Sequence, residues 1–122
     1  MLKKRVLIVE DEALLALDIA EELNSAGFTV LGPAASVVKA LDLVREEGCD
    51  AAILDVNIRD ETSEKIAATL REAGTPFCFL SGISKDECEP WMSNAPFVSK
   101  PVDFDNLFVT LNGLFEITDK GL

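Results

Sequence analysis

Five short apolar runs are spaced along the chain, with longer amphipathic segments between them. The runs read RVLIV, FTVLG, AAILD, FCFLS and PFVSK. Four of them are nearly continuous apolar stretches without strict alternation, which is typical of strands buried on both faces of a parallel sheet. The pattern therefore predicts five strands of one parallel sheet.

The segments between these strands place apolar residues three or four positions apart, and this spacing predicts amphipathic helices. We expect helices over residues 11–26, 37–47, 64–73 and 104–115. The segment SKDECEPWMSNAP, before the last strand, should hold only a turn or two of helix, because Pro90 and Pro96 interrupt it.

Residues suited to helix ends flank these segments. The N-cap candidates are Ser36, Ser63 and Asp103, and the stop candidates are Gly27, Gly48 and Gly74. Strands that alternate with helices over 122 residues predict one doubly wound α/β domain, residues 1–122, with right-handed crossovers.

Charge and composition narrow the range of partners. The formal net charge is −11, which argues against binding to nucleic acid or to an anionic membrane surface. An acid excess fits a cation site, a basic partner or simple solubility. No apolar run approaches the ~20 residues that span a bilayer, and Glu10 interrupts the only candidate signal-peptide core. We expect a cytoplasmic protein without membrane insertion.

The cysteines and histidines exclude several kinds of site. Cys49, Cys78 and Cys88 show no metal-type spacing, and their odd number favours a reducing compartment. The chain contains no histidine, so Ser–His and Cys–His nucleophiles and histidine-based metal sites are excluded.

Polar residues terminate four of the five predicted strands. The first strand runs into Glu10 and Asp11, the third ends in Asp55, the fourth in Ser81 and the fifth in Lys100. In open α/β sheets the ligand crevice lies beyond the carboxyl ends of the strands. We therefore expect these side chains to lie around one pocket.

The charges expected in that pocket restrict its chemistry. Three carboxylates a few ångströms apart repel one another by several kcal/mol at an effective dielectric constant near 20, so either a pKa rises or a cation binds among them. Oxygen ligands without histidine or thiolate suit Mg²⁺. A divalent cation, the ammonium of Lys100, the hydroxyl of Ser81 and one spare carboxylate together suit a phosphoryl group.

At these residues the chain resembles the receiver domain of two-component response regulators. The motifs are VLIVEDE, AILDVNI, FLSG and SKP, in the family's order and near its spacings, and the resemblance covers essentially the whole chain. It implies a flavodoxin-like sheet in the order 2-1-3-4-5. PFCFLSG is also similar to a set of stand-alone receivers, which makes the stand-alone, single-domain type the narrower expectation.

The resemblance also implies a role for each matching residue. Asp55 is the implied phosphoacceptor, and Ser81 and Lys100 are the implied contacts to the phosphoryl group. The implied Mg²⁺ ligands are Glu10, Asp11, Asp55 and the backbone carbonyl of Asn57. Ser81 and Phe97 stand at the switch positions, and the Lys100–Pro101 bond is expected to be cis.

The sequence departs from the family pattern at three places. The loop VNIRDETSE lacks the frequent proline and glycine, Phe97 lacks the hydroxyl of a tyrosine, and the fourth helix is broken by proline.

The main hypothesis is a signalling receiver rather than an enzyme. It takes a phosphoryl group from the phosphohistidine of a histidine kinase, or from a phosphotransfer protein, and then changes a surface that binds a downstream protein. The alternatives are a pseudo-receiver that binds partners without phosphorylation and, less in keeping with the motif order, a Mg²⁺-dependent phosphohydrolase. The chain can equally be a piece of a longer protein.

Overall fold

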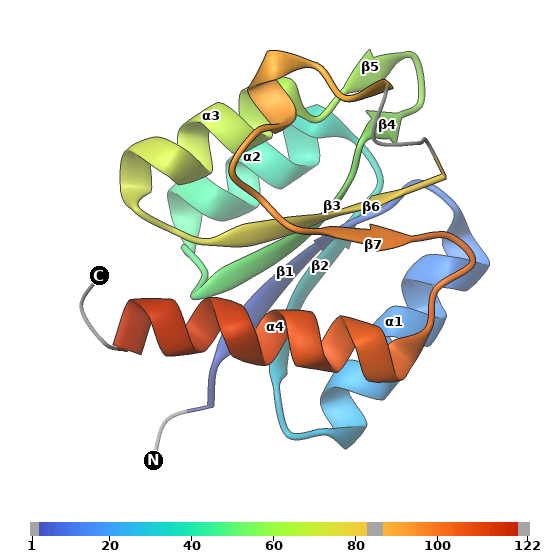
Figure 1. The fold of residues 1–122 in the computed structure, drawn as a ribbon, viewed down its shortest axis with the longest axis vertical. Helices are drawn as coiled ribbons and strands as arrows, with labels where there is room; N and C mark the ends of the chain where they lie inside the picture. The colour runs from blue at the N-terminus through green and yellow to red at the C-terminus, as the bar shows by residue number, and fades with distance from the viewer. Residues whose placement is uncertain (1–2, 83–86, 120–122) are drawn as a thin grey trace.

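The structure is a computed structural model that describes residues 3–82 and 87–119. Its centre is a five-stranded parallel sheet in the order β2-β1-β3-β6-β7 (Figure 1). The strands are β1 (Arg5–Val9), β2 (Thr29–Ala34), β3 (Ala51–Asp55), β6 (Phe77–Ser81) and β7 (Phe97–Ser99). Because β6 and β7 are the fourth and fifth strands of this sheet, the order is the predicted 2-1-3-4-5, and the doubly wound fold is confirmed.

In the described part of the chain, four α-helices cover the sheet, two on each face (Figure 1). The pairs are α1 (Ala13–Ser25) with α4 (Phe104–Asp119), and α2 (Val37–Glu46) with α3 (Glu64–Ala73). The predicted helix over residues 11–26 starts two residues later than expected, and the last helix continues past residue 115. Among these helices, none has the length and apolarity needed to cross a bilayer.

The sheet separates two hydrophobic clusters. Along β1, Val6 and Ile8 pack with α1 and α4, whereas Leu7 and Val9 pack with α2 and α3, and all four side chains are fully buried. Because both faces of the strand are covered, both sets of alternate positions must be apolar. This double burial explains why the strand runs of the sequence show no polar alternation.

Two of the three N-cap candidates make the expected side-chain cap bond. The Ser36 hydroxyl accepts a hydrogen bond from the Lys39 N–H at 3.2 Å, and Asp103 Oδ1 accepts one from the Asn106 N–H at 3.3 Å. Ser63 stands at the N-cap position of α3, but its hydroxyl makes no cap bond and instead donates to the Val56 carbonyl at 3.4 Å. Ser63 is fully buried, so its hydroxyl needs a partner inside the protein.

The second strand is longer than predicted because it contains a bulge. Leu7 pairs with Leu31 but Val9 pairs with Ala34, so β2 carries one extra residue opposite β1. Gly32 has a φ of 90°, a conformation that glycine adopts without steric strain. Beyond the bulge, the Ala34 carbonyl accepts the Glu10 N–H at 3.0 Å and joins the strand to the first acidic residue.

Two connections differ from ordinary loops. The segment after β3 forms a small antiparallel hairpin of β4 (Asn57–Ile58) and β5 (Glu61–Thr62), which the sequence pattern did not predict. Between β6 and β7, the residues described from 87 onward include a short 3-10 turn, η2 (Pro90–Met92), in agreement with the expected turn or two. The expected segment also includes residues 84–86, which lie outside the described residues.

Candidate functional site

The carboxyl ends of four neighbouring strands meet at one edge of the sheet. Glu10 directly follows β1, Asp55 ends β3, Ser81 ends β6 and Lys100 directly follows β7. Their positions are fixed by the ladder, since Asp55 pairs with Leu80 and the Lys100 N–H donates to the Ser81 carbonyl at 3.0 Å. The parallel register therefore brings the predicted residues of separate strands to one place.

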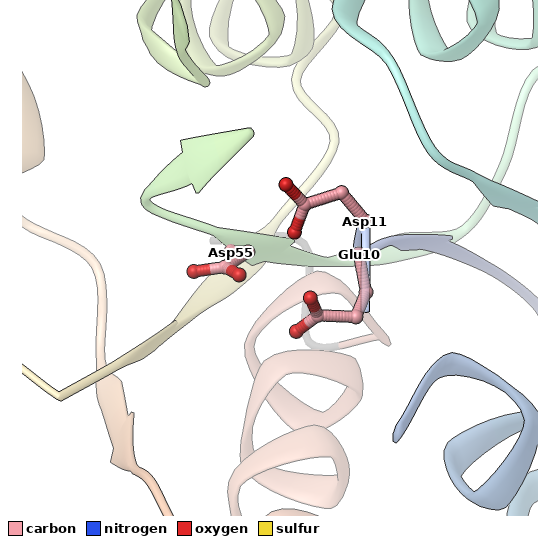
Figure 2. Close-up of side chains that lie close together, drawn as sticks. All are labelled: Glu10, Asp11 and Asp55. Atoms are coloured by element: carbon pink, nitrogen blue, oxygen red, sulfur yellow. The ribbon is translucent and has the colours of Figure 1, made fainter. Parts of the chain in front are cut away.

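Three acidic side chains converge there. Glu10, Asp11 and Asp55 each offer a carboxyl oxygen, and these oxygens all lie within 4.8 Å of one another. Figure 2 shows the three carboxyl groups turned toward a common space, with Glu10 and Asp11 approaching it from the end of β1. Glu10 is 1% exposed and Asp55 is 8% exposed, whereas Asp11 is open to solvent.

Lys100 bridges the two buried acids. Its Nζ lies 2.8 Å from Asp55 Oδ2 with hydrogen-bond geometry, and 2.9 Å from Glu10 Oε1 as an ion pair. The approach to Glu10 lacks hydrogen-bond geometry, so Oε1 is a buried oxygen without a hydrogen-bond partner among the described residues. One ammonium thus faces two carboxylates, which leaves the cluster with an excess of negative charge.

The pKa values reflect this imbalance. Burial raises the pKa of Glu10 to about 7, although the Glu12 N–H, donating to Oε2 at 2.9 Å, and the Lys100 ammonium both oppose the shift. A hydrogen bond from the Arg59 N–H is the main cause that lowers the pKa of Asp11. Burial by itself lowers the pKa of Lys100, but its interactions with Asp55 and Glu10 outweigh burial and raise it.

The donor set fits a hard divalent cation. All three groups are carboxylates, the kind of ligand that Mg²⁺ prefers, and the single Lys100 ammonium offsets only part of their negative charge. The backbone of Asn57, at the start of β4, lies two residues beyond Asp55. Its carbonyl as a fourth ligand stays a prediction.

The two expected switch residues lie on the adjacent strands. Ser81 is 5% exposed at the end of β6. Phe97 is half-buried at the start of β7, and its ring centroid lies 5.3 Å from that of Phe79. Phe79 in turn contacts Trp91 of η2 edge to face at 5.5 Å. Phe97 is therefore linked to η2 through the ring of Phe79.

One residue of this site was not predicted. Arg59, in the turn between β4 and β5, donates its backbone N–H to Asp11 Oδ2 at 2.7 Å. Sequence inspection gave this arginine no role, because the contact is made by its backbone across 48 positions of the chain. The only hint was the unusual loop VNIRDETSE, in which this turn lies.

Comparisons with known proteins agree with this arrangement. The family model of the response regulator receiver domain matches residues 6–112. The chain belongs to the response regulator receiver family. This receiver is 36% identical to SdrG from Sphingomonas melonis Fr1, whose solution structure superposes with a TM-score of 0.80 over 93% of this chain and 97% of that one. A CheY-like receiver from Methylobacillus flagellatus is 26% identical with a TM-score of 0.80, covering 93% and 99% of the two chains.

Among curated proteins, the receiver matches parts of longer chains. It is 31% identical to the sensor kinase CckA of Brucella abortus over 93% of its own length, which is 13% of that protein. It is 40% identical over 45% of its length to the transcriptional regulatory protein PdtaR of Mycobacterium tuberculosis, covering 27% of that protein. The chain therefore spans about a quarter or less of these curated relatives.

Family membership confirms the resemblance that the sequence motifs indicated. Receivers are signalling modules of two-component systems, they bind Mg²⁺ at an acidic site, and they interact with histidine kinases and downstream partners. The structure brings together Glu10, Asp11, Asp55 and Lys100, with Ser81 on the neighbouring strand end. The Lys100–Pro101 peptide bond is cis, as predicted.

Proposed function

We propose that this receiver accepts a phosphoryl group on Asp55 from a phosphohistidine of a histidine kinase or phosphotransfer protein. The observation that carries the proposal is the Lys100 ammonium, held 2.8 Å from Asp55 Oδ2 and 2.9 Å from Glu10 Oε1 inside an acidic cluster. A partly buried lysine between two carboxylates places positive charge where the oxygens of an incoming phosphoryl group need it.

In the transfer step, a carboxylate oxygen of Asp55 forms a bond to phosphorus. The phosphorus–nitrogen bond of the phosphohistidine breaks, and its electron pair remains on the imidazole nitrogen, which leaves as a neutral ring after taking up a proton. The product on Asp55 is an acyl phosphate. Lys100, which contacts Asp55, and the hydroxyl of Ser81, at the end of the neighbouring strand, would interact with its phosphoryl oxygens.

The metal requirement follows from the acidic cluster. Mg²⁺ would be held by Glu10, Asp11, Asp55 and the Asn57 carbonyl, and it supplies positive charge that offsets the negative charge of the carboxylates and of the phosphoryl oxygens. The residues of the chain itself orient Asp55: β3 fixes its backbone and Lys100 fixes its Oδ2 atom.

The output is a change of surface rather than a chemical product. We propose that a phosphoryl group on Asp55 draws Ser81 toward it and thereby shifts the packing of Phe97 against Phe79, which changes the surface offered to a downstream protein. We propose that the receiver acts in the cytoplasm and passes its signal on through contact with proteins rather than with nucleic acid, in keeping with its net charge of −11.

Incubation with a small acyl phosphate, with and without Mg²⁺, tests the proposal by intact-protein mass spectrometry. We expect the wild-type protein to gain the mass of one phosphoryl group only when Mg²⁺ is present, and Asp55→Asn to gain none. Asp60→Asn, which changes an exposed aspartate of the same region, is the matched control and should be modified like the wild-type protein.

The same experiment separates the alternative functions. A pseudo-receiver gains no mass under any condition. A phosphohydrolase releases phosphate continuously from small phosphate esters, and this turnover stops when Mg²⁺ is removed. Modification that is equal without Mg²⁺, or that persists in Asp55→Asn, would contradict the proposed mechanism.

A further inference from the structure

The β4–β5 turn is attached to the acidic site by both the backbone and the side chain of Arg59. The backbone N–H donates to Asp11 Oδ2 at 2.7 Å, and the side-chain Nε–H donates to the Ala35 carbonyl at 2.9 Å. Ala35 directly follows the bulged strand β2, whose Ala34 carbonyl also accepts the Glu10 N–H. A single residue thus links the hairpin, the end of β2 and the second acidic residue.

The backbone conformation of Arg59 is unusual for its residue type. Its φ is 58°, in the left-handed region that non-glycine residues seldom adopt. This conformation directs the N–H toward Asp11. An arginine keeps such a conformation when other contacts hold it, and the side-chain bond to Ala35 is a contact of that kind.

We propose that Arg59 is a positioning residue for the divalent cation, a role that rests on the proposed function. The bond to Ala35 holds the left-handed turn, and the turn fixes the exposed carboxylate of Asp11 beside Glu10 and Asp55. Asp11 is the one member of the cluster that is open to solvent, so its side chain has the most freedom to lose when a cation binds. A carboxylate that is already fixed binds the cation more tightly.

Because Arg59 is positively charged, the direction in which its removal changes the cation affinity tests the proposal. If the guanidinium affected the site only through its positive charge, its removal would strengthen cation binding. If it positions Asp11, its removal weakens binding in spite of the lost repulsion. A purely structural role would lower stability and leave the affinity of the folded protein unchanged.

The experiment is a Mg²⁺ titration of the folded protein, followed by backbone NMR shifts, in three variants. Arg59→Lys keeps the charge but loses the Nε–H bond, and we expect its Mg²⁺ dissociation constant to rise about fivefold to tenfold, the effect of one hydrogen bond. Arg59→Gly and Arg59→Ala share the same charge, and glycine adopts the left-handed turn more readily, so Arg59→Gly should bind Mg²⁺ more tightly than Arg59→Ala. Arg45→Lys, an exposed arginine on α2, is the control and should match the wild-type protein.

A second readout is independent of the metal. Hydrogen exchange of the residue 59 amide in the metal-free protein should be faster in Arg59→Lys than in the wild-type protein, because the turn is no longer held. The role of Arg59 would be overturned if Mg²⁺ affinity followed only the charge at position 59. It would also be overturned if the variants were less stable but bound Mg²⁺ as tightly as the wild-type protein. A wild-type protein without any Mg²⁺-dependent shift would instead overturn the proposed metal site, and the positioning role with it.

Discussion

Replacing the bridging lysine tests the electrostatic account of the site most directly. In Lys100→Met the apolar stem is largely kept, but Glu10 and Asp55 lose the ammonium between them. In the wild-type protein the ammonium offsets the mutual repulsion of these carboxylates, whose oxygens lie within 4.8 Å, and removing one partner from a buried ion pair costs about 3–5 kcal/mol. We expect the metal-free variant to lose about 3 kcal/mol of its free energy of unfolding when both acids are ionised.

The loss should depend on pH in a defined direction. The pKa of Glu10 is about 7 in the folded protein, above its ordinary value of 4.5, and loss of the ammonium raises it further. A carboxyl group whose folded-state pKa is raised binds its proton more tightly when folded, so its contribution to stability is present at low pH and is lost as the pH rises. The destabilisation should therefore be smaller at about pH 5.5, where mainly the loss of the Lys100–Asp55 pair remains, and larger at about pH 8.5, where Glu10 is also ionised.

Urea unfolding, followed by the fluorescence of Trp91 in a chelating buffer, gives the required free energies at both pH values. The matched control is Lys39→Met, the same substitution at an exposed site on α2, which should change stability little at either pH. Added Mg²⁺ should restore much of the lost stability, because a cation then replaces the ammonium. An equal loss at both pH values would refute the reasoning and assign the effect to packing of the lysine stem.

Three further substitutions or measurements test other features. Gly32→Ala should lower the free energy of unfolding by about 3 kcal/mol, because φ is 90° there and the added Cβ would lie 2.7 Å from the Ala34 nitrogen. The control Gly27→Ala has open space around the added Cβ, so it should lower the free energy of unfolding by only about 1 kcal/mol in the same urea assay. Alkylation of Cys78, whose pKa burial raises to about 12, should be detectable by mass spectrometry only after unfolding at mildly alkaline pH. Arg71→Lys should cost about 1 kcal/mol and shift the tryptophan emission, because its two guanidinium hydrogen bonds to the η2 segment, both at 2.6 Å, are lost.

The sheet and the strand-end residues were predictable because their signals are local. A strand buried on both faces needs a continuous apolar run, and the polar residue that follows it must stand at the sheet edge, so Asp55 and Lys100 could be placed without coordinates. Helix ends were predicted well where the cap bond is local, as at Ser36. Ser63 was placed correctly at the N-cap of α3, but its side-chain cap bond is absent because its hydroxyl donates to the buried Val56 carbonyl instead.

The remaining features depend on contacts between distant segments. The β4–β5 hairpin consists of two-residue strands with mostly exposed side chains, which leave no periodic pattern, and its position follows from the bond between Arg59 and Asp11. The bulge in β2 needs Gly32, but a glycine followed by a proline reads as a turn rather than as part of a strand. Neither feature can be assigned until the partner strand is known.

The sheet separates the two hydrophobic clusters completely. We therefore expect substitutions in one cluster to affect stability independently of substitutions in the other. Leu70 of α3 and Leu111 of α4 are both fully buried but belong to different clusters. Truncating both to alanine should lower stability by nearly the sum of the two single effects, whereas Ile66 and Leu70, one turn apart in the same cluster, should deviate from the sum. Substitutions can therefore accumulate beneath α2 and α3 without any need for compensation beneath α1 and α4.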